Sequence, residues 1–219
     1  MGLVQLAFEL MDNIKVVKPR NLGWLEKKLS DEEMSFLFSC IENKKRNMND
    51  DLAGNIYQSN VLSDTNNIFF RNTLLPLCKK YEEEFFDLSE SVPINTKPKF
   101  FLKSFWVNFQ KQNDFNPIHQ HTGVYSFVIW MKIPTRHKEQ NANIVSNAPR
   151  VSSFGFIWTN ILGQLEDYVY EMNPEVEGTM VFFPSKLKHV VYPFFNCDET
   201  RISISGNIAL NTGNIREVV

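Results

Sequence analysis

Three of the four histidines in this sequence are its best candidates for chemistry. His119 and His121 form the pair His-Gln-His in NPIHQHTGVYSFVIW, and His189 follows about 70 residues later in FPSKLKHVVYPF. Residues i and i+2 of an extended strand point to the same face, so His119 and His121 can enter one cavity. Imidazoles from two strands could together bind iron, zinc, copper or nickel. HxH pairs also arise by chance, and either side chain could serve core hydrogen bonds instead.

A second candidate is the segment RISISGN, which has polar residues at every second position. If this segment is a strand, one face carries the polar row, which consists of Arg201, Ser203, Ser205 and Asn207. A row that faces solvent would make Arg201 unremarkable. A row that faces a cavity would bury a guanidinium, which then needs an anionic partner. The planar fork of Arg201 matches a carboxylate, and Ser203 could add a hydroxyl donor to the same group.

The elements that must position these residues change in character along the chain. After the linker SVPINTKPK, short apolar or alternating runs follow one another, separated by turn residues, as in FFLKSFWVNF and VYSFVIWMKI. This pattern is typical of a β-sandwich or barrel. We therefore expect a mainly β protein with N-terminal helices. Residues 1–95 should form a largely helical region that packs on a barrel of residues 96–219, together one compact domain.

Two helices are expected in the N-terminal region. Ser30 and Glu33 have the spacing of a capping box, before the apolar periodicity of MSFLFSCIENKK. A second helix should run over about 67–86, and Pro76 inside it should kink or split it. His137 lies in the polar stretch RHKEQNANIVSNAPR and is expected to be solvated.

Composition excludes several classes of protein. The net charge of −2 and the pI of about 6.1 disfavour a nucleic-acid partner. The three scattered cysteines, without CxxC spacing, are expected to be free thiols in a reducing compartment. Neither a signal peptide nor a membrane span is recognisable, so a cytoplasmic location is the expectation. Contact between helical N-terminal regions in a homodimer stays open.

The candidate residues occur in a combination that resembles the 2-oxoglutarate/iron(II)-dependent oxygenase superfamily. HxH is followed by the strand GTMVFFPS, by His189, and by RIS, which begins 12 residues after that histidine. The likeness is greatest to a branch from marine bacteria and their phages, with motifs W-x-N, NPxHxH, FPS-x-x-x-H and R-x-S-x-S-x-N. Trp106-Val107-Asn108 supplies the first motif here, and the likeness covers about residues 99–210. It implies a double-stranded β-helix, the jelly-roll barrel that cupins also have.

The resemblance also implies roles for single residues. Fe(II) would be held by His119, His121 and His189, and 2-oxoglutarate would chelate it. The far carboxylate of 2-oxoglutarate would bind Arg201 and Ser203, and Trp106 and Asn108 would face the same cavity. The implied reaction couples oxidative decarboxylation of 2-oxoglutarate to hydroxylation of a C–H bond in an unknown substrate, a small molecule or a protein or peptide.

One departure from the superfamily pattern affects the metal. His121 stands where the superfamily has an iron-binding aspartate. Three neutral imidazoles leave a Fe(II) site with charge +2, whereas a carboxylate would leave +1, which alters redox tuning and metal retention. Asp114 is a nearby carboxylate, but it precedes the strand, and Gln120 should point away when His119 points inward.

Two other functions remain open from sequence. A cupin-like dioxygenase with three histidines and no 2-oxoglutarate would use the same imidazoles, but would give Arg201 no role. A non-enzymatic barrel that binds a small ligand or another protein would make the three-histidine pattern accidental.

Overall fold

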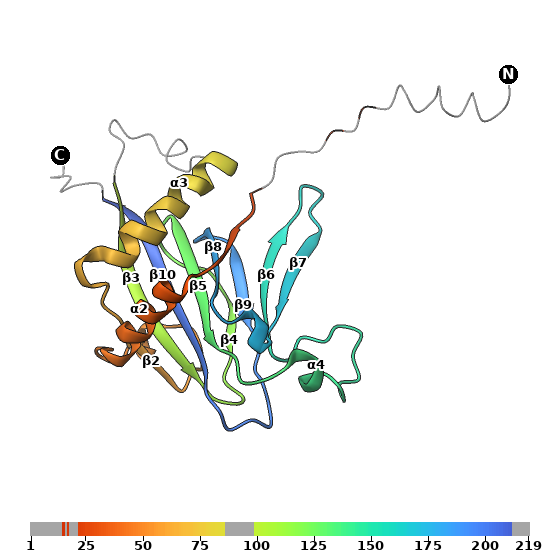
Figure 1. Ribbon diagram of the computed structural model, residues 1–219. Helices are drawn as coiled ribbons and strands as arrows, with labels where there is room; N and C mark the ends of the chain where they lie inside the picture. The colour runs from red at the N-terminus through yellow and green to blue at the C-terminus, as the bar shows by residue number, and fades with distance from the viewer. Residues whose placement is uncertain (1–14, 16, 18–21, 86–98, 212–219) are drawn as a thin grey trace, which may run out of the picture.

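Two antiparallel sheets face each other in the computed structural model, which describes residues 15, 17, 22–85 and 99–211. Figure 1 shows the larger sheet next to the helices and the smaller sheet on its other side. The larger sheet has the order β1 (Leu25–Lys28), β8 (Thr179–Pro184), β5 (Tyr125–Lys132), β10 (Arg201–Asn211), β3 (Lys99–Gln110) and β2 (Gln58–Val61). The smaller sheet has the order β4 (Asn116–His119), β9 (Lys188–Val191), β6 (Ser153–Thr159) and β7 (Leu165–Glu171).

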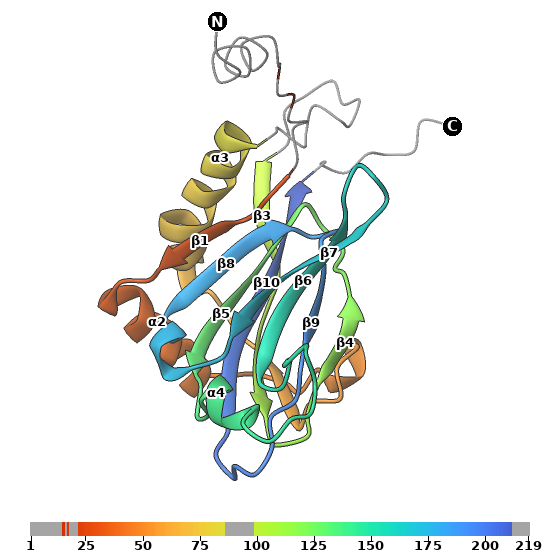
Figure 2. The ribbon, with the colours of Figure 1, turned by 90° about the vertical axis from the view of Figure 1, so that its right-hand side faces the viewer.

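Successive strands from β3 to β10 are distributed over both sheets. β3, β5, β8 and β10 lie in the larger sheet, and β4, β6, β7 and β9 lie in the smaller one, as Figure 2 also shows. This arrangement is the double-stranded β-helix predicted from the sequence. The region before residue 95 contributes more than helices, because β1 pairs with β8 and β2 pairs with β3 at the two edges of the larger sheet. The division of the chain at residue 95 remains a prediction.

Helices α2 (Asp31–Glu42) and α3 (Leu75–Glu84) pack on the outer face of the larger sheet (Figure 1). The predicted capping box of α2 is confirmed, because the Ser30 side chain accepts from the Glu33 amide and the Glu33 side chain accepts from the Ser30 amide. Ahead of α3, the π-helical segment η3 (Phe70–Leu74) places Pro76 in the first turn of α3, where a missing N–H costs little. The prediction of a helix disturbed by Pro76 is therefore confirmed.

The remaining elements are short. They are η1 (Asn49–Asp51), η2 (Thr65–Asn67), α4 (His137–Gln140) and η5 (Pro174–Val176). Within the described ranges, every helix is too short or too polar to cross a bilayer.

The interior contains two hydrophobic clusters, and β10 lies between them. Its side chains alternate between the two faces of the larger sheet. Ile204 and Ile208 are fully buried in the cluster between the larger sheet and the helices. The second cluster, which includes Trp130 and Phe154, lies between the sheets. The polar row of RISISGN is buried as well, with exposed fractions from 1% for Arg201 to 8% for Ser203. The row thus faces the space between the sheets rather than solvent, and that space holds the candidate site.

Close packing around Gly206 predicts a stability effect. Gly206 is flanked by β3 and β5, and a Cβ there would lie 2.8 Å from the Ser104 carbonyl oxygen and against the buried Phe127 ring. We expect Gly206→Ala to lower the free energy of unfolding by about 1–3 kcal/mol in chemical denaturation. Gly155→Ala in β6 is the matched control, since its Cβ would meet nothing closer than 3.4 Å. Equal losses in both variants would contradict this explanation.

Candidate active site

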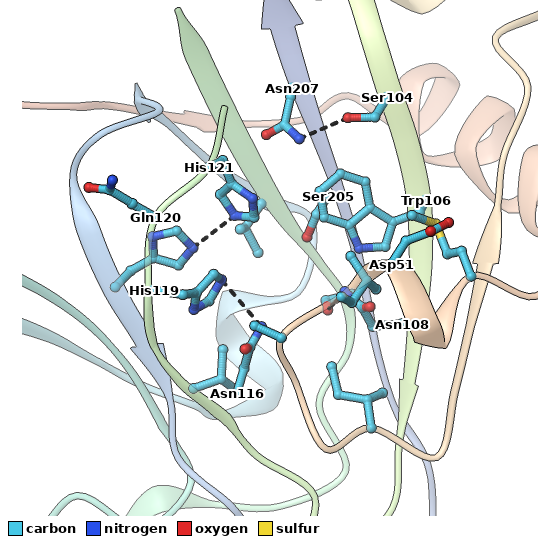
Figure 3. Close-up of a pocket in the computed structure, with 18 of the residues that line it drawn as sticks. Asp51, Ser104, Trp106, Asn108, Asn116, His119, Gln120, His121, Ser205 and Asn207 are labelled. Carbon is cyan, nitrogen blue, oxygen red and sulfur yellow. Dashed lines mark hydrogen bonds between the residues drawn. The ribbon is translucent and has the colours of Figure 1, made fainter. Parts of the chain in front are cut away.

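A cavity of about 390 Å³ opens between the two sheets and contains most of the candidate residues. Figure 3 shows imidazoles on one side of it and the indole of Trp106 on the other. The polar side chains around it are mostly amides and hydroxyls, and Asp51 is the only carboxylate among the described residues that line it. The lining residues include Asp51, Trp106, Asn108, Gln110, Asn116, His119, His121, His189 and Ser203.

Strand pairing brings the three predicted histidines together. β4 pairs with β9 so that His119 lies opposite His189, and His121 follows two residues after His119. The ligand nitrogens of the three imidazoles all lie within 4.8 Å of one another. The Nε2 atoms of His121 and His189 are 3.1 Å apart.

Backbone carbonyls orient two of these rings. His119 Nδ1 lies 2.7 Å from the Pro117 oxygen, and His189 Nδ1 lies 3.0 Å from the Leu187 oxygen. A carbonyl can only accept, so each Nδ1 carries the proton and donates it. Each Nε2 therefore keeps its lone pair, as in metal-binding histidines whose other nitrogen is held by a carbonyl. The donor set consequently suits a divalent transition metal.

Burial keeps the three imidazoles neutral, which metal binding requires. Burial, together with a smaller effect of the neighbouring His119, lowers the pKa of His121 to about 4. Burial also lowers the pKa of His189 well below its usual range, with added effects from His119 and His121. The pKa of His119 is lowered by burial as well. At neutral pH no proton competes strongly with a metal for this site.

These shifts predict how the stability of the metal-free protein depends on pH. The unfolded chain takes up protons near the ordinary pKa of 6.5, but folded His121 resists protonation down to about 4. Stability is therefore full above pH 6.5 and falls as the pH drops toward 4, by about 3 kcal/mol for this residue. Free energies of unfolding measured with chelator present should show a shallower pH dependence in His121→Gln. Parallel curves for the variant and the wild type would contradict the burial argument.

Arg201 lies deep beside the cavity, with its guanidinium 4.6 Å from the Phe194 ring centroid and no carboxylate partner among the described residues. It is 1% exposed, and its guanidinium donates to two neutral oxygens, Tyr192 O at 3.2 Å and Ser152 Oγ at 2.9 Å. Its Nε is buried without a hydrogen-bond partner, and burial lowers its pKa to about 9. Arg201 is not itself among the residues that line the cavity.

The neighbours of Arg201 extend this donor site toward the cavity. Gln110, its cross-strand partner on β3, lines the cavity, and its Nε2 is also buried without a partner. Ser203, two residues along β10, lines the cavity as well. A buried cation beside an unpaired amide donor leaves a place for an anion. Tyr192, which accepts from Arg201, follows His189 by three residues, so the guanidinium and the imidazole cluster lie along the same segment of the chain.

Trp106 and Asn108 also line the cavity from β3, as their spacing predicts. Asn108 Oδ1 accepts a hydrogen bond from Ser59 Oγ of β2 at 2.8 Å, and Asn108 Nδ2 lies 3.5 Å from Ser203 Oγ. The Trp106 ring lies 5.8 Å from the His121 ring, centroid to centroid.

Other sequence expectations are settled by position. The expectation of a solvated His137 is wrong. As the first residue of α4 it is buried, at 6% exposure, with Nδ1 3.6 Å from Glu171, and it does not line the cavity. Asp114 Oδ2 accepts from the backbone amides of Tyr57 and Lys111, so it braces a loop. Gln120 is exposed and borders the cavity, but its amide points away from the imidazoles in Figure 3.

Several lining residues were missed by sequence reasoning. Gln110 continues the alternation of Trp106 and Asn108, so the period of the strand could have revealed it. Asn116 could not be found this way, because it precedes His119 by three positions. The segment 48–56 also borders the cavity, through Met48, Asp51, Leu52, Ala53 and Ile56. The sequence of this segment contains no pattern that predicts this position.

Comparison with known proteins agrees with the site. A family model for 2OG-Fe(II) oxygenases matches residues 104–207. A Burkholderia pseudomallei oxidoreductase of the 2OG-Fe(II) oxygenase family has a similar structure, with TM-score 0.55 and 12% identity over 99% of this chain and 95% of that chain. A Pseudomonas putida prolyl-4-hydroxylase matches with TM-score 0.51 and 14% identity over 84% of this chain and 91% of that chain. No relative was found among curated protein sequences.

At these identities the solved structures support the fold, and the family model supports the function. The matched residues include all three clustered histidines and Arg201. The narrower likeness to a branch from marine bacteria and phages remains a prediction. The match favours an enzyme that uses iron and 2-oxoglutarate over both the cupin-like and the non-enzymatic alternatives. Over residues 104–207 the chain is similar to the 2-oxoglutarate/iron(II)-dependent oxygenases, and its fold resembles that of a solved member of this superfamily.

Proposed function

We propose that this oxygenase is a hydroxylase whose iron is held by His119, His121 and His189 and whose 2-oxoglutarate is anchored by Arg201. The observation that supports this most strongly is the pairing of two complementary sites in one place. Three neutral nitrogen donors cluster within 4.8 Å, and a buried guanidinium without a carboxylate partner lies just beyond them. A metal ion suits the three nitrogen donors. A dicarboxylate with a 2-oxo group can bind this metal at one end and the guanidinium at the other.

Each residue of the chain has a defined task in this proposal. The imidazoles bind the metal through Nε2, with rings fixed by the Pro117 and Leu187 carbonyls. Arg201 and Gln110 bind the far carboxylate, and Ser203 adds a hydroxyl donor. When bound, iron would activate O₂ with two electrons from 2-oxoglutarate. One oxygen atom would go to succinate, which forms with CO₂, and the other to the hydroxylated C–H bond of the substrate.

The substrate is proposed to be a small molecule or a peptide side chain that is neutral or cationic. The cavity wall offers amides and hydroxyls for hydrogen bonds, the indole of Trp106 for an apolar contact, and one carboxylate, Asp51. Asp51 is half-exposed and ion-paired with Arg46 at 3.2 Å, so an incoming cation would compete with that contact. A panel of free amino acids and short peptides, scored by substrate-stimulated succinate formation, tests this assignment. Stimulation by acidic substrates alone would contradict it.

The primary experiment uses the wild-type protein without substrate. Apoprotein is loaded with Fe(II) without oxygen, 2-oxoglutarate is titrated in, and the visible charge-transfer absorption of the chelate is followed. We expect a saturable band. Metal binding without a band would point to a cupin-like use of the histidines, and absence of metal binding would contradict the proposed ligand set.

We also propose a cytoplasmic location, supported by the free thiols of Cys40 and Cys78, which are both buried. A homodimer through the helical N-terminal region and the absence of a nucleic-acid partner remain predictions. Fractionation of the native cells and light scattering of the purified protein would test location and dimerisation. An exported protein would contradict the first, and a monomer at micromolar concentration the second.

A further inference from the structure

An irregularity in β4 turns a fourth polar side chain toward the three imidazoles. Asn116 pairs with Val191 and His119 pairs with His189, so three steps along β4 match only two along β9. In a regular strand, residues three apart point to opposite faces. The extra residue of this bulge reverses the alternation, so both Asn116 and His119 line the cavity. Bulges beside active sites commonly re-aim a side chain in this way.

The Asn116 amide lies about as close to the His119 imidazole as the His121 and His189 imidazoles lie to each other. Asn116 Nδ2 is 3.3 Å from His119 Nε2, a contact drawn as a dashed line in Figure 3. His121 Nε2 is 3.1 Å from His189 Nε2. Adjacent ligands on an ion with bonds of about 2.1 Å are separated by roughly 3 Å. Both separations are therefore those of neighbouring donors around one ion.

The amide oxygen of Asn116 lacks a hydrogen-bond partner, and a cation could bind to it. Nδ2 donates to the lone pair of His119 Nε2, while Oδ1 is buried without a partner. A metal on Nε2 would use that lone pair and leave Nδ2 without its acceptor. Turning the amide by half a revolution then directs Oδ1 to the cation, because the two ends of an amide have nearly the same shape.

We propose that the amide oxygen of Asn116 is a fourth protein ligand of the metal. This inference rests on the proposed function, because it requires the three imidazoles to bind the same ion. It places an oxygen donor in a centre where His121 has replaced the customary carboxylate. Three imidazoles and one amide leave two of six octahedral positions, the number that a chelating 2-oxo acid occupies. A neutral amide is the weakest donor of the set, so a further ligand would displace it first.

Cobalt(II) affinity measured by competition with a chromogenic chelator tests this ligand without using activity. Asn116→Leu keeps the volume but removes the donor, and we expect about a tenfold weaker affinity. Asn116→Asp replaces the amide by a charged oxygen donor of the same shape, and we expect affinity at least about tenfold tighter. Gln120→Glu is the matched charge control, since this exposed side chain is near in sequence but points away from the imidazoles (Figure 3). Its effect should be severalfold smaller than that of Asn116→Asp.

The outcomes separate this inference from the proposal beneath it. Wild-type protein that fails to bind cobalt would overturn both. Wild-type binding that is unchanged in Asn116→Leu would overturn the fourth ligand alone and leave the three-histidine site intact. Equal gains in Asn116→Asp and Gln120→Glu would also overturn it, because charge without contact would then explain the gain. Circular dichroism on each variant shows that the fold is retained.

Discussion

Replacing His189 by alanine is expected to weaken metal binding by more than about 100-fold and to reduce 2-oxoglutarate turnover to background. Changes to residues that merely support metal ligands already cost about 10- to 100-fold in affinity, and His189 is proposed as a ligand itself. Its ring is 2% exposed and lies against the rings of Phe154 and Phe183. An exposed side chain therefore cannot reach this position to replace His189 as a metal ligand. Chelator competition with cobalt(II) and succinate formation provide the two measurements.

His137→Ala is the matched control for this substitution. His137 is equally a buried histidine, at 6% exposure, but it lies in α4 outside the cavity. We expect that variant to lose some stability and to retain metal affinity within about twofold of the wild type. An active, metal-replete His189→Ala protein would refute the ligand assignment.

Replacing Arg201 by alanine is expected to weaken 2-oxoglutarate binding by about 10- to 100-fold and to leave cobalt(II) affinity nearly unchanged. A hydrogen bond to a charged group contributes about 1.5–3 kcal/mol, and each 1.4 kcal/mol is a factor of ten in affinity. The same variant should be less stable, because Ser152 Oγ and the Tyr192 carbonyl lose their donor. Titration of the charge-transfer band and thermal melting measure the two effects separately.

Two further variants separate charge from geometry at this position. Arg201→Lys keeps a cation but loses the planar fork, so its affinity for 2-oxoglutarate should lie between those of wild type and alanine. Arg136→Ala removes an exposed arginine that pairs with Glu175, and it should leave the affinity for 2-oxoglutarate unchanged. Unaltered affinity in Arg201→Ala, with the fold intact, would assign the far carboxylate to other donors.

Local periodicity in the sequence determined much of the fold and part of the site. The period of two along an extended strand put His119 with His121, and it put the polar row of β10 on a single face. The capping box at Ser30 and Glu33 set the start of α2 by contacts within four residues. These features could be predicted because their physical cause lies between residues that are close in the chain.

The tertiary structure alone decided which distant segments meet. The register of β4 against β9 placed His189 opposite His119, and the bulge in β4 turned Asn116 into the cavity. Residues 48–56 border the cavity, and His137 is buried at the start of α4. Neither position could be predicted from a pattern in the neighbouring sequence. Strand register and docking depend on packing between segments that are far apart in the chain. The sequence by itself therefore determined which side chains are candidate metal and carboxylate ligands. The pairing of strands decided which of them lie next to one another.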